Sequence, residues 1–273
     1  MFRSLASAGI SALLFAFTAV GAANAQDALE RAKAAGVLQV ATEEQFPPYD
    51  FIKGGEHVGY NVDIFAELGK ELGLEIAYTD LPWSSVLPGL EAGKYDVVAG
   101  PAAITAERQK RFRFLIPIDQ SQTSIMKRKG TEKIMKSADI AGLTIGAQRA
   151  ANPMTDLKAY AETLDPAPTI KEYVDYSQAY ADLAAGRLDG VANGSTNVLY
   201  TAAQRPGVFE VVLPGFGELH YSSFLGRKDE DSKTLLDALD EALLTIEKDG
   251  RMATIQTKWF GQPVELPTEV PTP

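Results

Sequence analysis

The sequence has no cysteine and only two histidines in its 273 residues. The lack of cysteine excludes disulfide bonds, thiol catalysis and a lipid-modified N-terminal cysteine. Because only His57 and His220 could supply imidazole, a zinc site is not expected, and the sequence predicts no cofactor. After the N-terminal segment, no apolar run approaches about 18 residues, so no membrane-spanning helix is predicted there.

Positive charge is also scarce. The chain has 26 Lys and Arg against 36 Asp and Glu, and its formal net charge is −10. An excess of negative charge argues against nucleic acid and anionic lipid as partners. We therefore expect neither nucleic-acid binding nor direct insertion into a membrane.

Residues 1–25 have the three-part order of a secretory signal peptide. Arg3 supplies a positive charge, an apolar run occupies residues 10–20, and the small residues Ala-Asn-Ala at 23–25 form a cleavage site. Cleavage there would leave an exported chain that begins at Gln26. The alternative is an uncleaved N-terminal anchor.

Hydrophobic periodicity predicts an α/β protein. Residues 28–35 have a helical pattern that Gly36 ends, and residues 37–41 form a short β-rich segment. Helical spacing returns at 61–72, and the alternation within 74–78 is typical of a strand. This β-α-β order favours a sheet with parallel strands.

One segment of the sequence is repeated about ninety residues later. Residues 90–100 read LEAGKYDVVAG, and residues 183–193 read LAAGRLDGVAN. Each copy predicts a helix end, a glycine, a basic residue, an aspartate and a strand. Two lobes built on one plan would produce this pattern, although chance similarity of two short turns is an alternative. In two such lobes, the strand ends near Gly100 and Asn193 would face a ligand crevice.

The C-terminal region contains a helix and a proline-rich end. Ser232 is predicted to cap a long amphipathic helix that Gly250 stops. Its leucine stripe is interpreted as core packing, with a partner surface as the alternative. Residues 262–273 contain four prolines and little apolar periodicity, which predicts a disordered tail.

Two predicted helix starts could bind an anion. Thr105 can cap a helix that places Arg108 in its first turn, and free amides beside a guanidinium form a carboxylate site. The alternative is a solvated basic face along 108–113. Asn152 and Pro153 form an N-cap and first-turn pair, which is either a second anion contact or an ordinary capped helix.

Several side chains near predicted loops suit the wall of a binding site. Phe46, Tyr49 and Trp83 are aromatics that could form flat apolar surfaces, although any of them could belong to a core. Glu43 follows the first predicted strand and could receive a cation, although surface glutamates are common.

The chain as a whole resembles the polar-amino-acid family of periplasmic solute-binding proteins, known as family 3 of the extracellular solute-binding proteins. The likeness covers nearly the whole mature chain and is carried, in order, by EEQFPPYDF, VGYNVDIFAELGKELG, LPWSSVLPGLEAGKYDVVAG, AITAER and EKDGRMATIQTKWFG. It implies two α/β lobes, each a sheet flanked by helices, joined by two crossover segments. The first lobe would comprise 26–120 and 218–261, and the second 121–217.

The resemblance also implies a function. A family member binds a small-molecule solute in the periplasm by hinge closure and delivers it to an inner-membrane ABC permease, acting as a soluble, non-enzymatic monomer. The alternatives are an enzyme on the same scaffold, such as a cyclohexadienyl dehydratase, or a periplasmic accessory or sensor protein.

Site residues follow from the resemblance position by position. Arg108 resembles the arginine that binds the ligand's α-carboxylate, and Asn152 resembles a helix start that contacts the same group. The remaining matches are the aromatic walls Phe46 and Trp83, the acidic position Glu43, and the loop residues Gly100, Pro101 and Ala103.

The sequence departs from the family pattern at several of these positions. Pro101 and Ala103 replace hydroxyl residues, and Ala-Ala-Asn at 150–152 replaces a Gly-Thr-Thr type of turn. Gly194 stands where an aspartate would pair with the ligand's ammonium. A buried ammonium without a partner is costly. We therefore expect either a carboxylate whose nitrogen is absent, substituted or conjugated, or a site in which Glu43 supplies the missing charge.

In the first case, hydroxyl or amide groups of the ligand would be bound beside that position. Asn193 and Ser195 flank Gly194 and carry side chains that can hydrogen-bond such groups.

Overall fold

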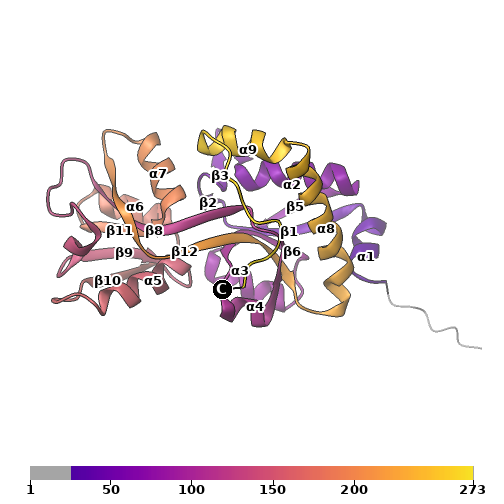
Figure 1. The fold of residues 1–273 in the computed structure, drawn as a ribbon, viewed down its shortest axis with the longest axis horizontal. Helices are drawn as coiled ribbons and strands as arrows, with labels where there is room; N and C mark the ends of the chain where they lie inside the picture. Colours follow the sequence, from indigo (N-terminus) through magenta and orange to yellow (C-terminus); the bar gives the residue numbers. More distant parts are fainter. Residues whose placement is uncertain (1–25, 273) are drawn as a thin grey trace, which may run out of the picture.

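The computed structural model describes residues 26–272, which form two α/β lobes connected by two long strands (Figure 1). The predicted signal peptide 1–25 lies outside the described residues. The helices of the first lobe are α1 (Ala28–Ala35), α2 (Tyr60–Leu72), α3 (Trp83–Glu91), α4 (Ala106–Arg111), α8 (Glu230–Lys248) and α9 (Arg251–Phe260). Its strands are β1 (Val37–Thr42), β5 (Glu75–Asp80), β6 (Val97–Ala103) and β7 (Phe112–Phe114), with a separate small sheet of β2 (Gln45–Phe46), β3 (Asp50–Lys53) and β4 (Glu56–Val58).

The second lobe is smaller. It contains a short 3-10 helix (Ser137–Ile140), strands β9 (Thr144–Gln148), β10 (Thr169–Tyr173) and β11 (Gly190–Gly194), and helices α5 (Asn152–Ala161), α6 (Tyr176–Ala184) and α7 (Ser195–Gln204). Strands β8 (Asp119–Arg128) and β12 (Phe209–Arg227) run between the lobes, side by side and antiparallel (Figure 1). The predicted two-lobed α/β fold with two crossovers is confirmed.

The crossovers make the two lobe sheets continuous. The nine-stranded sheet has the order β10-β9-β11-β8-β12-β6-β1-β5, with β7 also paired to β12. The register of β12 shifts between Val212 and Phe216 and again before His220, where the strand passes from one lobe to the other. The expected lobe boundaries at 120/121 and 217/218 fall inside β8 and β12.

The repeated segment forms the same structure in both lobes. In the first lobe, the Asp96 amide donates to the Gln39 carbonyl at 2.9 Å, and the Gln39 amide donates to the Asp96 carboxylate at 3.1 Å. In the second lobe, Asp189 and Thr144 make the same two bonds, at 2.9 and 3.0 Å. The aspartate therefore joins the start of each repeated strand to its parallel neighbour, β1 or β9.

Of the helix N-caps predicted from the sequence, one is confirmed and two are wrong. Thr105 caps α4 as predicted, accepting the Arg108 amide at 3.2 Å. Ser232 was wrongly predicted as the cap of α8, because Asp229 takes that role and accepts the Ser232 amide at 2.8 Å. Asn152 is also not an N-cap. It is the first helical residue of α5, and Ala151 occupies the cap position without a side-chain bond.

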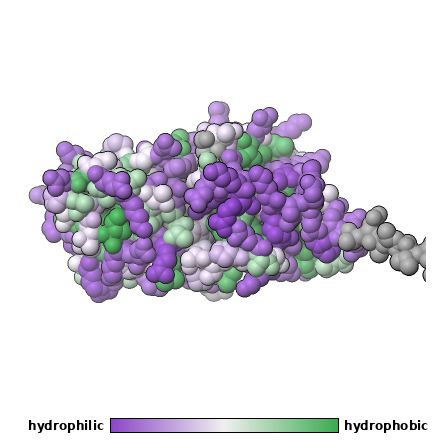
Figure 2. Space-filling view, turned by 90° about the horizontal axis from the view of Figure 1, so that it is seen from below, coloured by the Kyte–Doolittle hydropathy of each residue, from purple (hydrophilic) through white to green (hydrophobic). Residues whose placement is uncertain are grey.

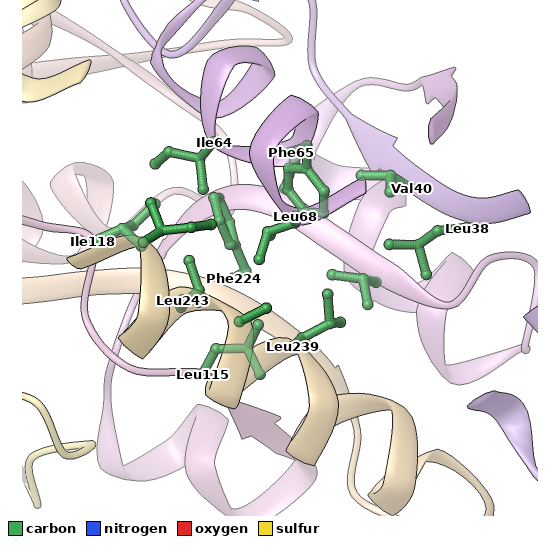
Figure 3. Packing of buried hydrophobic residues seen from close by; sticks show 14 of the residues in the cluster. Leu38, Val40, Ile64, Phe65, Leu68, Leu115, Ile118, Phe224, Leu239 and Leu243 are labelled. Atoms are coloured by element: carbon green, nitrogen blue, oxygen red, sulfur yellow. The ribbon is translucent and has the colours of Figure 1, made fainter. Parts of the chain in front are cut away.

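The leucine stripe of α8 packs in the core of the first lobe, as predicted. Figure 3 shows Phe224 of β12 between side chains of α2 and α8. Its ring centroid lies 4.6 Å from that of Phe65, and both rings are fully buried. Burial of each large apolar side chain contributes roughly 1.5 to 3 kcal/mol. Residues of β6 and β12 both belong to this core, and both strands lead to the interlobe space.

The proline-rich end has no helix or strand over 262–272, yet it makes specific contacts with the first lobe, in contrast to the expected disorder. The Val264 amide donates to the Gln256 side chain at 3.0 Å, and the Gln109 side chain donates to the Pro271 carbonyl at 2.9 Å. Figure 1 shows this segment running from α9 across the crossovers toward α4.

The surface view in Figure 2 shows a largely hydrophilic face with smaller hydrophobic patches. Among residues 26–272, no helix is long and apolar enough to span a bilayer. The same residues contain no group of three or more His, Cys, Asp or Glu side chains suited to hold a metal ion.

Candidate functional site

A cavity lies where the two lobes face each other. Ser195 does not line it, but nine other positions expected to contact the ligand do. These are Glu43, Phe46, Trp83, Gly100, Pro101, Ala103, Arg108, Asn152 and Asn193. The cavity encloses about 670 Å³ of space, part of which is open to solvent. The carboxyl ends of β6 and β11 both reach it, as expected for strands of an open α/β sheet.

Arg108 is a cation held against the cavity wall by carbonyl groups. Its guanidinium donates to the Ala103 carbonyl at 3.1 Å in its own lobe and to the Ala150 carbonyl at 3.4 Å in the other. It also lies 5.7 Å from the ring centre of Trp83. Burial lowers the pKa of Arg108 to about 10, which still leaves it charged at neutral pH. Within residues 26–272, no carboxylate lies within ion-pair distance of this group, so it can receive an anion.

The carbonyl that meets Arg108 belongs to a strained turn. Ala150 has φ of 62°, a left-handed conformation that side chains other than glycine rarely adopt. Its carbonyl also accepts the Trp83 indole N–H at 3.2 Å. The turn that precedes α5 therefore links the second lobe to both Arg108 and Trp83 of the first.

Glu43 makes a second link between the lobes. It follows β1, is 6% exposed, and accepts a hydrogen bond from the Gln148 side chain of β9 at 2.5 Å. Burial raises the pKa of the Glu43 carboxyl to about 7, while hydrogen bonds from Gln148 and the backbone amide of Trp83 act in the opposite direction. The pKa of this carboxyl therefore lies near neutral pH and not in the usual carboxyl range.

Aromatic rings form one wall of the cavity. Phe46 stacks on Tyr49, with centroids 5.3 Å apart and planes 15° apart, and approaches Tyr176 of the second lobe at 5.8 Å. Trp83 stands at the start of α3 and is 8% exposed. Flat apolar surfaces of this kind contact the carbon skeleton of a small ligand, while a few polar groups fix its orientation.

The end of β6 contributes backbone and small side chains. A Cβ atom on Gly100 would lie 2.5 Å from the Ala102 amide nitrogen, so only glycine fits there. Pro101 and Ala103 carry no hydroxyl. Hydroxyls at the cavity come instead from the crossover strands, where Ser121 and Ser222 lie.

Asn193 lies at the cavity with its amide already bonded to protein. Its Nδ2 donates to the Tyr180 hydroxyl at 2.9 Å and to the Asn197 side chain at 2.6 Å, and its Oδ1 accepts the Gly194 amide at 2.7 Å. The Asn197 Nδ2 in turn donates to the Pro47 carbonyl of the first lobe. Asn193 thus stabilises the wall through this network and has little capacity left for a ligand.

The start of α5 carries a second polar network. The Asp156 carboxylate accepts the Thr123 hydroxyl at 2.5 Å and the Asn152 side-chain amide at 3.1 Å. Its other oxygen lies 3.4 Å from His220 Nε2 on β12. Asn152 therefore reaches the cavity with one of its amide hydrogens used within its own helix.

The sequence did not single out several of the other residues that line the cavity. These are Ser121, Gln122, Thr123, Gln148, Ala151, Tyr176, Asn197, His220 and Ser222. Five of them belong to the start of β8 or to β12. The position of the two expected crossovers was the sequence feature that could have identified the residues on β8 and β12, because segments that join two lobes border the space between them.

Comparisons with known proteins agree with this arrangement. The bacterial extracellular solute-binding proteins of family 3 match residues 38–262. The chain is 28% identical to the L-cystine-binding protein TcyJ of Escherichia coli K12 over 238 residues, which cover 86% of this chain and 87% of the relative.

Two solved structures are also similar. An ancestral arginine-binding protein bound to arginine is 30% identical with a TM-score of 0.76, and the match covers 83% of this chain and 99% of that one. An ancestral amino acid-binding protein, described as a precursor of cyclohexadienyl dehydratase, is 26% identical with a TM-score of 0.74, and the match covers 86% and 99%.

Proposed function

The chain belongs to family 3 of the bacterial extracellular solute-binding proteins, and from this premise we propose that it captures a small polar carboxylate in the periplasm for an inner-membrane ABC permease. It acts as a monomer and releases its ligand unchanged. The observation that carries the proposal is Arg108, a half-buried cation at the interlobe cavity whose side-chain hydrogen bonds go to neutral carbonyls. Charged and bidentate hydrogen bonds make guanidinium a strong carboxylate partner.

The contacts between the lobes support capture by hinge closure. Glu43 meets Gln148, and Trp83 meets Ala150, which gives two neighbouring hydrogen bonds between the lobes. The lobes are joined through the two strands β8 and β12, whose register is irregular where they cross. Two rigid bodies joined by two flexible connections open and close as in other hinge proteins. The relatives named for cystine and arginine binding support an amino-acid-like size for the solute.

A thermal-shift screen of the chain from residue 26 onward tests this proposal. Amino acids, their conjugates, simple carboxylates and uncharged solutes are compared at equal concentration. A ligand present at 100 times its dissociation constant stabilises the protein by about 2.7 kcal/mol. We expect stabilisation by carboxylates, and none in an Arg108→Ala variant. Failure of every solute class to stabilise the protein would contradict the proposal.

An enzyme is the second candidate, because Glu43 has a feature of general acids and bases. A carboxyl with a pKa of about 7 is well matched to proton transfer at neutral pH. One structural relative is described as a precursor of an enzyme. Incubation of the protein with each stabilising ligand, followed by NMR of the solution, separates the two functions. Recovery of unchanged ligand is expected, and a new product would favour the enzyme.

A further inference from the structure

The charged side chains that line the cavity are unequal in what they can offer a ligand. In the described part of the chain, Arg108 is the one Lys or Arg at the cavity and Glu43 the one Asp or Glu. Arg108 bonds only to carbonyls, whereas Glu43 already accepts the Gln148 amide at 2.5 Å. The site therefore presents a cation that needs a counter-charge and an acid that is already hydrogen-bonded.

The acid behind the cavity wall is also occupied. Asp156 accepts bonds from Thr123 and Asn152 and lies 3.4 Å from the His220 ring. Asp156 is not among the residues that line the cavity, so a ligand ammonium there does not meet its carboxylate directly. An ammonium buried without an acceptor of opposite charge loses several kcal/mol of hydration that nothing restores.

Gly194 leaves a neutral surface at the carboxyl end of β11. A Cβ atom there would lie 2.8 Å from the Ser121 hydroxyl, and Ser121 and Ser195 lie 3.2 Å apart. The φ of Gly194 is −57°, which any residue can adopt, so the backbone does not demand glycine. Helices α5 and α7 begin beside this surface without side-chain caps, and their positive ends favour an anion over a cation.

These observations point to a ligand class, and the inference rests on the proposed function. We propose that the solute is a carboxylate without a free ammonium on the neighbouring carbon, its nitrogen being absent, acylated or conjugated. The carboxylate binds Arg108, and a hydroxyl or amide of the ligand meets the Ser121 hydroxyl, which lies 3.2 Å from that of Ser195. This distinguishes the site from one that binds an ordinary amino acid.

Calorimetry with matched ligands tests the proposal. Each of the common amino acids is compared with its N-acetyl derivative and its des-amino analogue, for example L-glutamine, N-acetyl-L-glutamine and 4-carbamoylbutanoate. We expect the best ligand to be a member without the ammonium, and to bind at least about tenfold tighter than its parent amino acid. Tighter binding by the parent would overturn the proposal, as would the absence of binding in every set. In the latter case, stabilisation by another solute in the screen would leave the capture function standing.

A Gly194→Asp variant tests the placement of the nitrogen. An added carboxylate beside Ser121 should raise the affinity for the parent amino acid relative to its des-amino analogue by about tenfold or more. The Gly194→Asn variant has the same shape without the charge, and is expected to leave the ratio unchanged. If the ratio of the affinity for the amino acid to that for its des-amino analogue were equal in the two variants, the ligand nitrogen would not lie beside residue 194. Should the aspartate variant fail to fold, the ratio measured in the unaltered protein still decides on the ligand class.

Discussion

Replacement of Glu43 by glutamine should make the protein more stable in alkaline solution than the unaltered chain. Glu43 is buried at the contact between the lobes, where it accepts the Gln148 side-chain amide. A glutamine at this position keeps an acceptor oxygen of nearly the same shape. The substitution therefore removes the charge while it retains the hydrogen bond.

The size of the expected change in stability follows from the pKa of the Glu43 carboxyl. Burial raises the pKa of the Glu43 carboxyl from 4.5 to about 7 in the folded protein. Between these two values the unfolded chain has lost the proton while the folded chain retains it, so stability falls as pH rises. Each pKa unit corresponds to about 1.4 kcal/mol. The unaltered protein should lose about 2 to 3 kcal/mol between pH 5 and pH 8 through this residue, and the Glu43→Gln variant should not.

Urea unfolding followed by circular dichroism at pH 5 and pH 8 measures the effect. The difference in unfolding free energy between Glu43→Gln and the unaltered protein should grow by about 2 to 3 kcal/mol with pH. Burial also raises the pKa of Asp119, to about 6, but this contribution is common to both proteins and cancels. Glu132→Gln, at an exposed position, serves as the control. A difference that is the same at both pH values would refute the argument from burial.

Three further predictions concern the tail, the core and the hinge. Truncation after Gly261 removes the hydrogen bonds to Gln109 and Gln256 and the packing of Val270. The free energy of unfolding in urea should therefore fall by about 1 to 3 kcal/mol. An unchanged free energy would mean that the tail is not held against the first lobe. Phe224→Ala empties the centre of the first lobe and should cost about 3 to 5 kcal/mol in the same assay, where a cost below about 1 kcal/mol would contradict the packing. Small-angle X-ray scattering should show a smaller radius of gyration with the best carboxylate than without it, and an unchanged radius would argue against hinge closure.

Local patterns in the sequence were sufficient to predict where the cavity walls lie. The repeated segment located the carboxyl ends of β6 and β11, because a glycine, an aspartate and an apolar run determine where each strand starts and ends. The Thr105 cap placed Arg108 in the first turn of α4 for the same local reason. Both strand ends and this helix turn lie at the cavity.

Contacts between distant segments could not be predicted in this way. The bond between Glu43 and Gln148 joins residues 105 positions apart, and it depends on how the lobes meet. The hydroxyl of Ser121 reaches the cavity because β8 crosses between the lobes, which a pattern of alternating residues does not reveal.

The cap of α8 shows a different difficulty. Asp229, Asp231 and Ser232 are all residue types that favour caps, so their order in the sequence does not identify the one that accepts the amide hydrogen bond.

Calorimetry tests whether Arg108 binds a carboxylate in the interlobe cavity. The best carboxylate found by the thermal-shift screen is titrated into the unaltered protein and into Arg108→Ala. Loss of one partner from a buried charge pair costs roughly 2 to 5 kcal/mol, so the variant should bind about thirtyfold to several thousandfold more weakly. Arg108→Lys, which keeps the charge but not the fork of donors, should fall between the two. Equal affinity of the unaltered protein and Arg108→Ala would show that Arg108 does not bind the carboxylate.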